Sequence, residues 1–178
     1  MGAHREQKKA SAVGAGDLTP LLDVDACFDA LSQAQRLNDS AGIRSACGRL
    51  LDLYEAGSDE VRFKIVAGGG PSMPAVERRR LLERVLREDR SGLVRHEAAF
   101  ALSNFPDEAC EALLCSVGLN DSNSLVRHEA AIALMTVGSE RALQYLEHGL
   151  RDGNSEVVLS CRLAISAIHY RSNRSTSA

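Results

Sequence analysis

The chain has 178 residues, of which 44% are hydrophobic, 25% charged and only 4% aromatic, and its formal net charge is −3. This balance is ordinary for a globular protein, and the length is enough for one domain with a hydrophobic core. Because the chain lacks both a basic surplus for binding phosphates and an apolar run near the roughly 20 residues of a membrane span, we expect neither a nucleic-acid partner nor a membrane-spanning helix.

The middle of the chain has the pattern of consecutive short helices. Residues 1–18 are rich in Gly, Ala, Ser and Lys without periodicity, so we expect a flexible arm there and a disordered tail over residues 171–178. No segment alternates with the period of two that a half-buried strand needs, so residues 19–170 are expected to form a single all-α domain. In chain order, the expected helix starts are Thr19, Ser40, Ser58, Ser72, Ser91, Pro106, Ser124, Ser139 and Ser155.

Five cysteines lie in stretches that are expected to be helical. No two of them are spaced as a Cys-x-x-Cys pair, and their number is odd. Buried, reduced thiols in a cytoplasmic protein are the simplest interpretation, and a thiolate metal site is not expected. The N-terminal charges are not followed by the apolar region of a signal peptide, which also favours a cytoplasmic location. The residues are Cys27, Cys47, Cys110, Cys115 and Cys161.

An internal repeat of just over 30 residues organises this helical region. The sequence Ser-Leu-Val-Arg-His-Glu-Ala-Ala-Ile-Ala-Leu at residues 124–134 recurs 32 residues earlier, ending at Leu102, and a degenerate copy begins 31 residues later at Ser155. A weaker copy starts at Val61. A repeat of this length holds two antiparallel helices that bury one face on the neighbouring unit. The unit resembles the short HEAT-like repeat of helical solenoids.

Most of the shared motif is expected to serve packing. Val94, Ala98 and Leu102 fall on one face of a helix that turns about 100° per residue, and Ala101 lies beside them. Small Ala side chains allow two helices to approach closely. We expect the Arg that follows the Val, such as Arg95, to bind carbonyls or acidic residues of the neighbouring repeat.

The His-Glu pair within the motif is not required for stacking. It occurs as His96-Glu97 and His128-Glu129, whereas the outer copies have Phe63-Lys64 and Leu159-Ser160 at these positions. In the first turn of a helix, the positive end of the dipole disfavours imidazolium, and neutral imidazole is the form that binds metals.

Neighbouring helices are about 8–10 Å apart, so His96 and His128 can share one ion. Glu97 or Glu129 then supplies an oxygen, which gives the two-His, one-carboxylate ligand set of non-haem iron(II) oxygenases. A structural interpretation stands beside this one. A Glu near a helix start is common, and a recent duplication copies His-Glu whether or not the pair has a function.

Val-Arg-His-Glu-Ala in tandem resembles deoxyhypusine hydroxylase, a HEAT-repeat di-iron family with four His-Glu motifs in two halves. The resemblance covers roughly Val61 to Tyr170 and includes only two motifs, which is one half. It implies iron(II), as a single ion or a di-iron centre, and a homodimer that supplies the second half. It also implies metal ligands and, for the carboxylates, catalytic or substrate-facing residues at His96, Glu97, His128 and Glu129.

Three functional hypotheses remain open on the sequence. The first is a non-haem iron oxygenase or hydroxylase that acts, as a homodimer, on an amine-bearing small molecule or a peptidyl substrate. The second is a HEAT-repeat module that binds a protein partner without metal chemistry. The third is a protein similar to the phycobilin lyases, whose repeats share the Val-Arg-x-x-Ala-Ala pattern.

Overall fold

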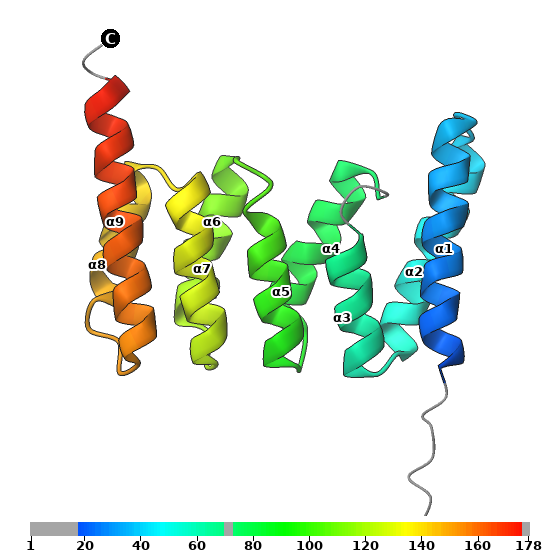
Figure 1. Cartoon of the computed structure of the whole chain (residues 1–178), viewed down its shortest axis with the longest axis horizontal. Helices are drawn as coiled ribbons and strands as arrows, with labels where there is room; N and C mark the ends of the chain where they lie inside the picture. The colour runs from blue at the N-terminus through cyan, green and yellow to red at the C-terminus, as the bar shows by residue number, and fades with distance from the viewer. Residues whose placement is uncertain (1–17, 70–72, 176–178) are drawn as a thin grey trace, which may run out of the picture.

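The computed structural model describes residues 18–69 and 73–175, which form a row of helices (Figure 1). This part of the chain contains no strand, which confirms the all-α prediction. Two short 3-10 turns, η1 (Gly118–Asn120) and η2 (Glu140–Ala142), precede α7 and α8. The helices are α1 (Thr19–Arg36), α2 (Ser40–Ala56), α3 (Asp59–Gly68), α4 (Ala75–Glu88), α5 (Gly92–Leu102), α6 (Glu108–Ser116), α7 (Ser124–Val137), α8 (Leu143–Gly149) and α9 (Ser155–Ser175).

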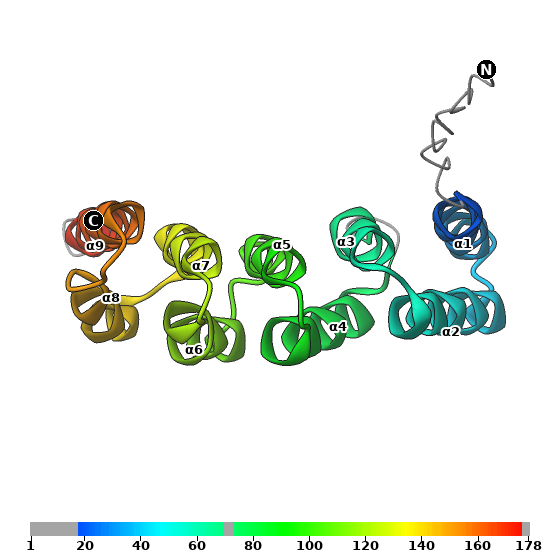
Figure 2. The same ribbon diagram turned by 90° about the horizontal axis from the view of Figure 1, so that it is seen from below.

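The helices alternate between two layers. Figure 2 shows α1, α3, α5, α7 and α9 in one layer, which we call the odd layer, and α2, α4, α6 and α8 in the other, the even layer. Each pair of consecutive helices is thus one repeat, and the repeats stack side by side as the sequence period predicts. None of the helices in the described ranges is both long and apolar enough to cross a membrane.

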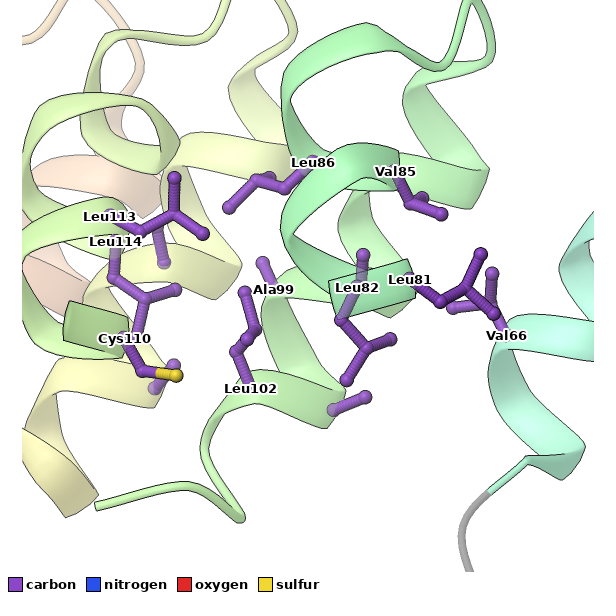
Figure 3. Packing of buried hydrophobic residues seen from close by; sticks show 14 of the residues in the cluster. Val66, Leu81, Leu82, Val85, Leu86, Ala99, Leu102, Cys110, Leu113 and Leu114 are labelled. Carbon is purple, nitrogen blue, oxygen red and sulfur yellow. The ribbon is translucent and has the colours of Figure 1, made fainter. Parts of the chain in front are cut away.

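The core lies between the two layers and is built from Leu, Val and Ala. Val94, Ala98, Ala101 and Leu102 of α5 are all buried, which confirms the predicted packing face. Figure 3 shows how Leu102 lies between side chains of α4 and α6. Ala98 and Ala99 in α5, like Ala130 and Ala131 in α7, have no exposed surface, so α5 and α7 approach each other without bulky side chains between them.

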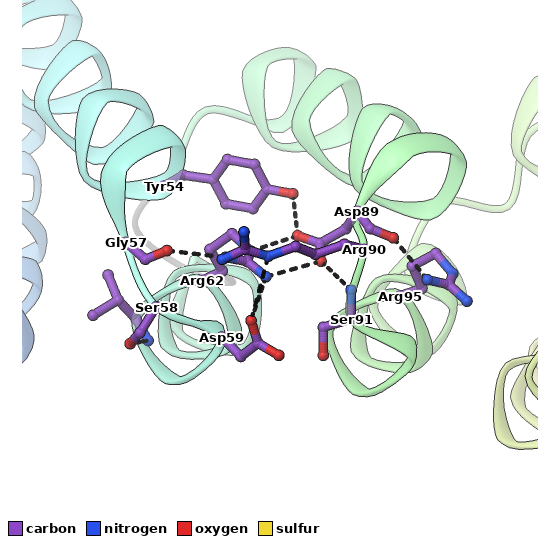
Figure 4. Close-up of polar contacts among 10 residues, drawn as sticks. Tyr54, Gly57, Ser58, Asp59, Arg62, Asp89, Arg90, Ser91 and Arg95 are labelled. Atoms are coloured by element: carbon purple, nitrogen blue, oxygen red, sulfur yellow. Dashed lines mark hydrogen bonds and ion pairs between the residues drawn. The ribbon is translucent and has the colours of Figure 1, made fainter.

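One arginine in each of the repeats that begin with α3, α5 and α7 joins consecutive turns of the solenoid. Nε and Nη2 of Arg95 donate to the two carboxylate oxygens of Asp121 at 2.7 and 2.8 Å, and Nη1 donates to the carbonyl of Asp89. Arg127 repeats this pattern with Asp152, and Arg62 with Asp89 (Figure 4). We call Arg62, Arg95 and Arg127 with their aspartates the arginine ladder. These contacts confirm the expectation that the Arg after the motif Val binds carbonyls or acidic residues of the neighbouring repeat.

The C-terminal helix is longer than expected. The predicted tail from Arg171 onward is wrong for residues 171–175, because α9 continues to Ser175. Arg171 holds this end of the helix by donating to the carbonyls of Met135 and Gly138 in the preceding repeat. The predicted N-terminal arm, apart from Leu18, and residues 176–178 lie outside the described residues.

All five cysteines are buried free thiols, as the sequence predicts. Burial raises the pKa of Cys110 and of Cys115 to about 12, and that of Cys161 to about 11. Such thiols stay protonated at neutral pH, so they are poor nucleophiles and poor metal ligands.

Candidate metal centre

The two His-Glu motifs lie on α5 and α7, which are neighbours in the odd layer (Figures 1 and 2). His96 and His128 are each the fifth residue of their helix, so the prediction that they lie in the first turn is wrong by about one residue. The helix dipole acts mainly within the first turn. The groups that these two side chains contact are therefore more important to them than the helix dipole.

His96 contacts the carboxylate of the next repeat rather than its own neighbour in sequence. Its Nε2 lies 3.2 Å from Oε2 of Glu129, whose residue is 8% exposed. The hydrogen bond that Nε2–H of His96 donates to the Glu129 carboxylate raises the pKa of His96 above its usual value, although burial opposes this. Nδ1 of His96 is buried and has no hydrogen-bond partner among the described residues.

Glu97 is half-buried beside this pair. Burial raises the pKa of the Glu97 carboxyl, and the charge of Glu129 adds to that effect, while His96 and Arg78 oppose it. Arg78 reaches this region from α4, and its guanidinium lies over the ring of Phe105 at 5.6 Å. Arg78 was not predicted from the sequence, because it belongs to another helix and to no repeated motif.

His128 contacts Ser160 of α9. Its Nδ1 lies 2.7 Å from Oγ of Ser160, and the same Oγ lies 2.7 Å from the carbonyl oxygen of Glu156. Ser160 is only 3% exposed. Because Leu159-Ser160 lacks the His-Glu pair, the sequence did not predict this contact.

The two histidine contacts follow one rule. His96 reaches Glu129, and His128 reaches Ser160, which occupies the Glu position of the next repeat. Each His therefore lies beside the second residue of the following motif. The repeat places these positions in corresponding turns, but which of them touch depends on the stagger of the helices, which the motif does not specify.

The His96–Glu129 contact is a hydrogen-bonded pair whose spacing would also suit two ligands of one ion. With bonds of about 2.1 Å, two ligands at right angles lie roughly 3.0 Å apart, close to the 3.2 Å observed. In the described ranges, no group of three or more His, Cys, Asp or Glu side chains is arranged to hold a metal ion. The expected set of His96, Glu97, His128 and Glu129 is thus brought together only in part.

Comparison with known proteins supports the repeat architecture. Residues 79–166 match the family described as HEAT repeats. No curated protein matches the sequence. The solved structure of human deoxyhypusine hydroxylase in complex with glycerol is similar, with a TM-score of 0.51 and 22% sequence identity over 90% of this chain and 48% of that chain. This chain therefore spans about half the length of that protein. The fold is an all-α, HEAT-like repeat solenoid.

Proposed function

We propose that this protein is a non-haem iron-dependent oxygenase or hydroxylase whose active site is completed by a second copy of the chain. The observation that carries the proposal is the His96–Glu129 pair, which places an imidazole nitrogen and a carboxylate oxygen 3.2 Å apart across two repeats. Two His and one carboxylate are the ligand set of non-haem iron(II) oxygenases. The likeness to human deoxyhypusine hydroxylase is consistent with this proposal.

In this proposal His96, His128 and Glu129 hold the iron, and the bound ion supplies oxygen activation. Glu129 contacts His96 across the two repeats, whereas His128, the residue before it in α7, contacts Ser160. Glu129 is also buried, which shields the carboxylate from water and strengthens its interaction with a cation.

In this proposal Glu97 binds the substrate and is not an iron ligand. Its half-buried carboxyl lies close enough to His96 and Glu129 for its pKa to respond to both. A desolvated carboxylate at the edge of a metal site binds a cationic group through charge-assisted hydrogen bonds. An amine-bearing small molecule or peptidyl side chain is therefore the substrate class that we propose.

A second copy of the chain is the proposed partner. Exposed apolar side chains flank the His-Glu motifs at helical spacings of three or four residues, such as Leu93 and Phe100 around His96 and Leu125 before His128. Leu159 and Leu163 of α9 extend this surface. We call these five residues the apolar rim. Pairing it about a two-fold axis would bring two His-Glu sets face to face and cover apolar surface.

The buried free thiols favour a reducing compartment, so we propose a cytoplasmic location for this enzyme.

Iron content and solution mass, measured on the same sample, test the proposal. The protein is purified without oxygen, loaded with iron(II), desalted and examined by elemental analysis and light scattering. We expect a dimer with one or two irons per dimer and loss of iron in the His96→Ala and His128→Ala variants. His148→Ala, which changes an exposed His of α8, is the matched control and should retain iron. A monomer without iron would overturn the proposal and favour a protein-binding module.

A further inference from the structure

The hydroxyl of Ser160 makes two short contacts at once. Its Oγ lies 2.7 Å from the carbonyl oxygen of Glu156, one turn earlier in α9, and 2.7 Å from Nδ1 of His128 in α7. Ser160 is buried, so water does not compete for either contact. The directions of these two hydrogen bonds therefore depend on the protein groups alone.

Counting protons fixes both directions. A serine hydroxyl has one proton to donate, and the Glu156 carbonyl can only accept. If that proton pointed to His128 instead, two oxygen atoms would face each other at 2.7 Å without a proton between them, which is repulsive. The hydroxyl therefore donates to Glu156, and its lone pair accepts the proton of His128 Nδ1.

We infer that Ser160 is a positioning residue that accepts the Nδ1–H of His128, so that the neutral form of this ring carries its lone pair on Nε2, where a metal ion would bind. The proposed role of Nε2 in metal binding rests on the proposed iron site. Metal-binding histidines usually donate their other ring N–H to an outer partner, which orients the ring. In the last repeat, Ser160 occupies the Glu position and provides that partner.

His96 and His128 use different ring nitrogens for their contacts. His96 uses Nε2 to contact Glu129, and its buried Nδ1 has no partner in the described ranges. His128 uses Nδ1 to contact Ser160, so its Nε2 makes no contact with that hydroxyl. His128 is thus oriented before any metal binds, whereas His96 is held by a carboxylate that the proposal counts as a ligand.

Ring-nitrogen NMR of the metal-free protein at pH 8 tests the tautomer directly. We expect His128 to show a protonated Nδ1 and an unprotonated Nε2 in the wild type and in Ser160→Thr, which keeps the hydroxyl. In Ser160→Ala the proton should move mainly to Nε2, the tautomer that free histidine prefers in water. Ser166→Ala is the control, because Ser166 makes the same bond to the carbonyl four residues earlier but is exposed. A wild-type Nε2–H tautomer, or no change in Ser160→Ala, would overturn the inference.

Cobalt(II) binding by the same variants tests the consequence. We expect Ser160→Ala to bind cobalt(II) about 10–100-fold more weakly, as is typical when an outer partner of a metal-binding His is removed. Ser160→Thr should bind within a few-fold of the wild type, and Ser166→Ala should be unchanged. Equal affinities for Ser160→Ala and wild type would overturn the positioning role. A wild type that shows the Nδ1–H tautomer but binds no cobalt(II) would refute the proposed metal function and still support the orientation of His128 by Ser160.

Discussion

Arg95 and Asp121 form a two-point ion pair, with Nε–Oδ2 and Nη2–Oδ1 distances of 2.7 and 2.8 Å. The same guanidinium donates to the carbonyl of Asp89, so Arg95 joins the turn before α5 to the turn before α7. Asp121 in turn accepts the backbone N–H of Asn123. Because the pair connects consecutive repeats, its loss should affect the whole stack rather than one helix.

Arg95→Ala should lower the free energy of unfolding by about 3–5 kcal/mol, because it leaves a buried carboxylate without its partner. Arg141→Ala is the matched control. Its ion pair with Glu108 has side chains that are 72% and 78% exposed, so its loss should cost less than about 1 kcal/mol. Urea unfolding monitored by circular dichroism measures both. Equal losses in the two variants would show that the ladder does not stabilise the stack.

The ladder should also make stability depend on pH in acid. The hydrogen bond from Arg127 holds the pKa of Asp152 below its usual value near 3.8. A carboxyl with a depressed pKa stabilises the fold above its unfolded-state pKa, and this contribution is lost as the pH falls through the folded-state pKa. Asp152→Asn should therefore be less stable than wild type by about 2 kcal/mol at pH 7.

This stability deficit should shrink as the pH falls from about 4 toward 3, because the wild-type carboxyl then becomes neutral as well. Urea titrations of both proteins at several pH values give the comparison. Glu108→Gln, at an exposed ion pair, serves as the control and should show no such convergence. A stability deficit in Asp152→Asn that stays constant with pH would show that ionisation of Asp152 does not stabilise the fold.

The sequence predicted the scaffold better than the site. The repeated motif predicted the helices, their stacking and the kind of group that Arg95 binds, because each of these depends on spacing within one unit. The His96–Glu129 contact depends on how α5 and α7 are staggered along their axes. That stagger is set by tertiary packing, and the motif itself carries no record of it. Sequence reasoning therefore named both residues but did not pair them.

Glu97 and Glu129 should differ in metal binding although they occupy the same motif position. Only Glu129 contacts His96 Nε2, so Glu129→Gln should weaken cobalt(II) binding by more than the roughly 10–100-fold expected for an outer partner. Glu97→Gln should change it by less than about 3-fold. Calorimetric titration of cobalt(II) measures both variants. Similar losses would contradict the separate roles that we propose for the two carboxylates.

The apolar rim should control dimer formation. Leu125→Asp places a charge beside His128 on the proposed interface, so the variant should be a monomer at concentrations where the wild type is a dimer. Leu51→Asp introduces the same change on α2 in the even layer, where Leu51 is 39% exposed compared with 48% for Leu125. Sedimentation velocity distinguishes the monomer from the dimer. Dissociation by Leu51→Asp, or a dimeric Leu125→Asp, would place the interface elsewhere.

Two glycines should respond in opposite directions to the same substitution. Gly48 lies within α2, and an added Cβ would meet no atom within 4 Å, so Gly48→Ala should stabilise the protein by about 0.5–1 kcal/mol through helix propensity. At Gly118 in η1, the added Cβ would lie 2.5 Å from Cβ of Ala130 in α7. Gly118→Ala should therefore cost about 1–3 kcal/mol by pushing η1 away from α7. Thermal unfolding measures both changes. A neutral Gly118→Ala would mean that η1 and α7 can separate without loss, contrary to the tight packing of η1 on α7.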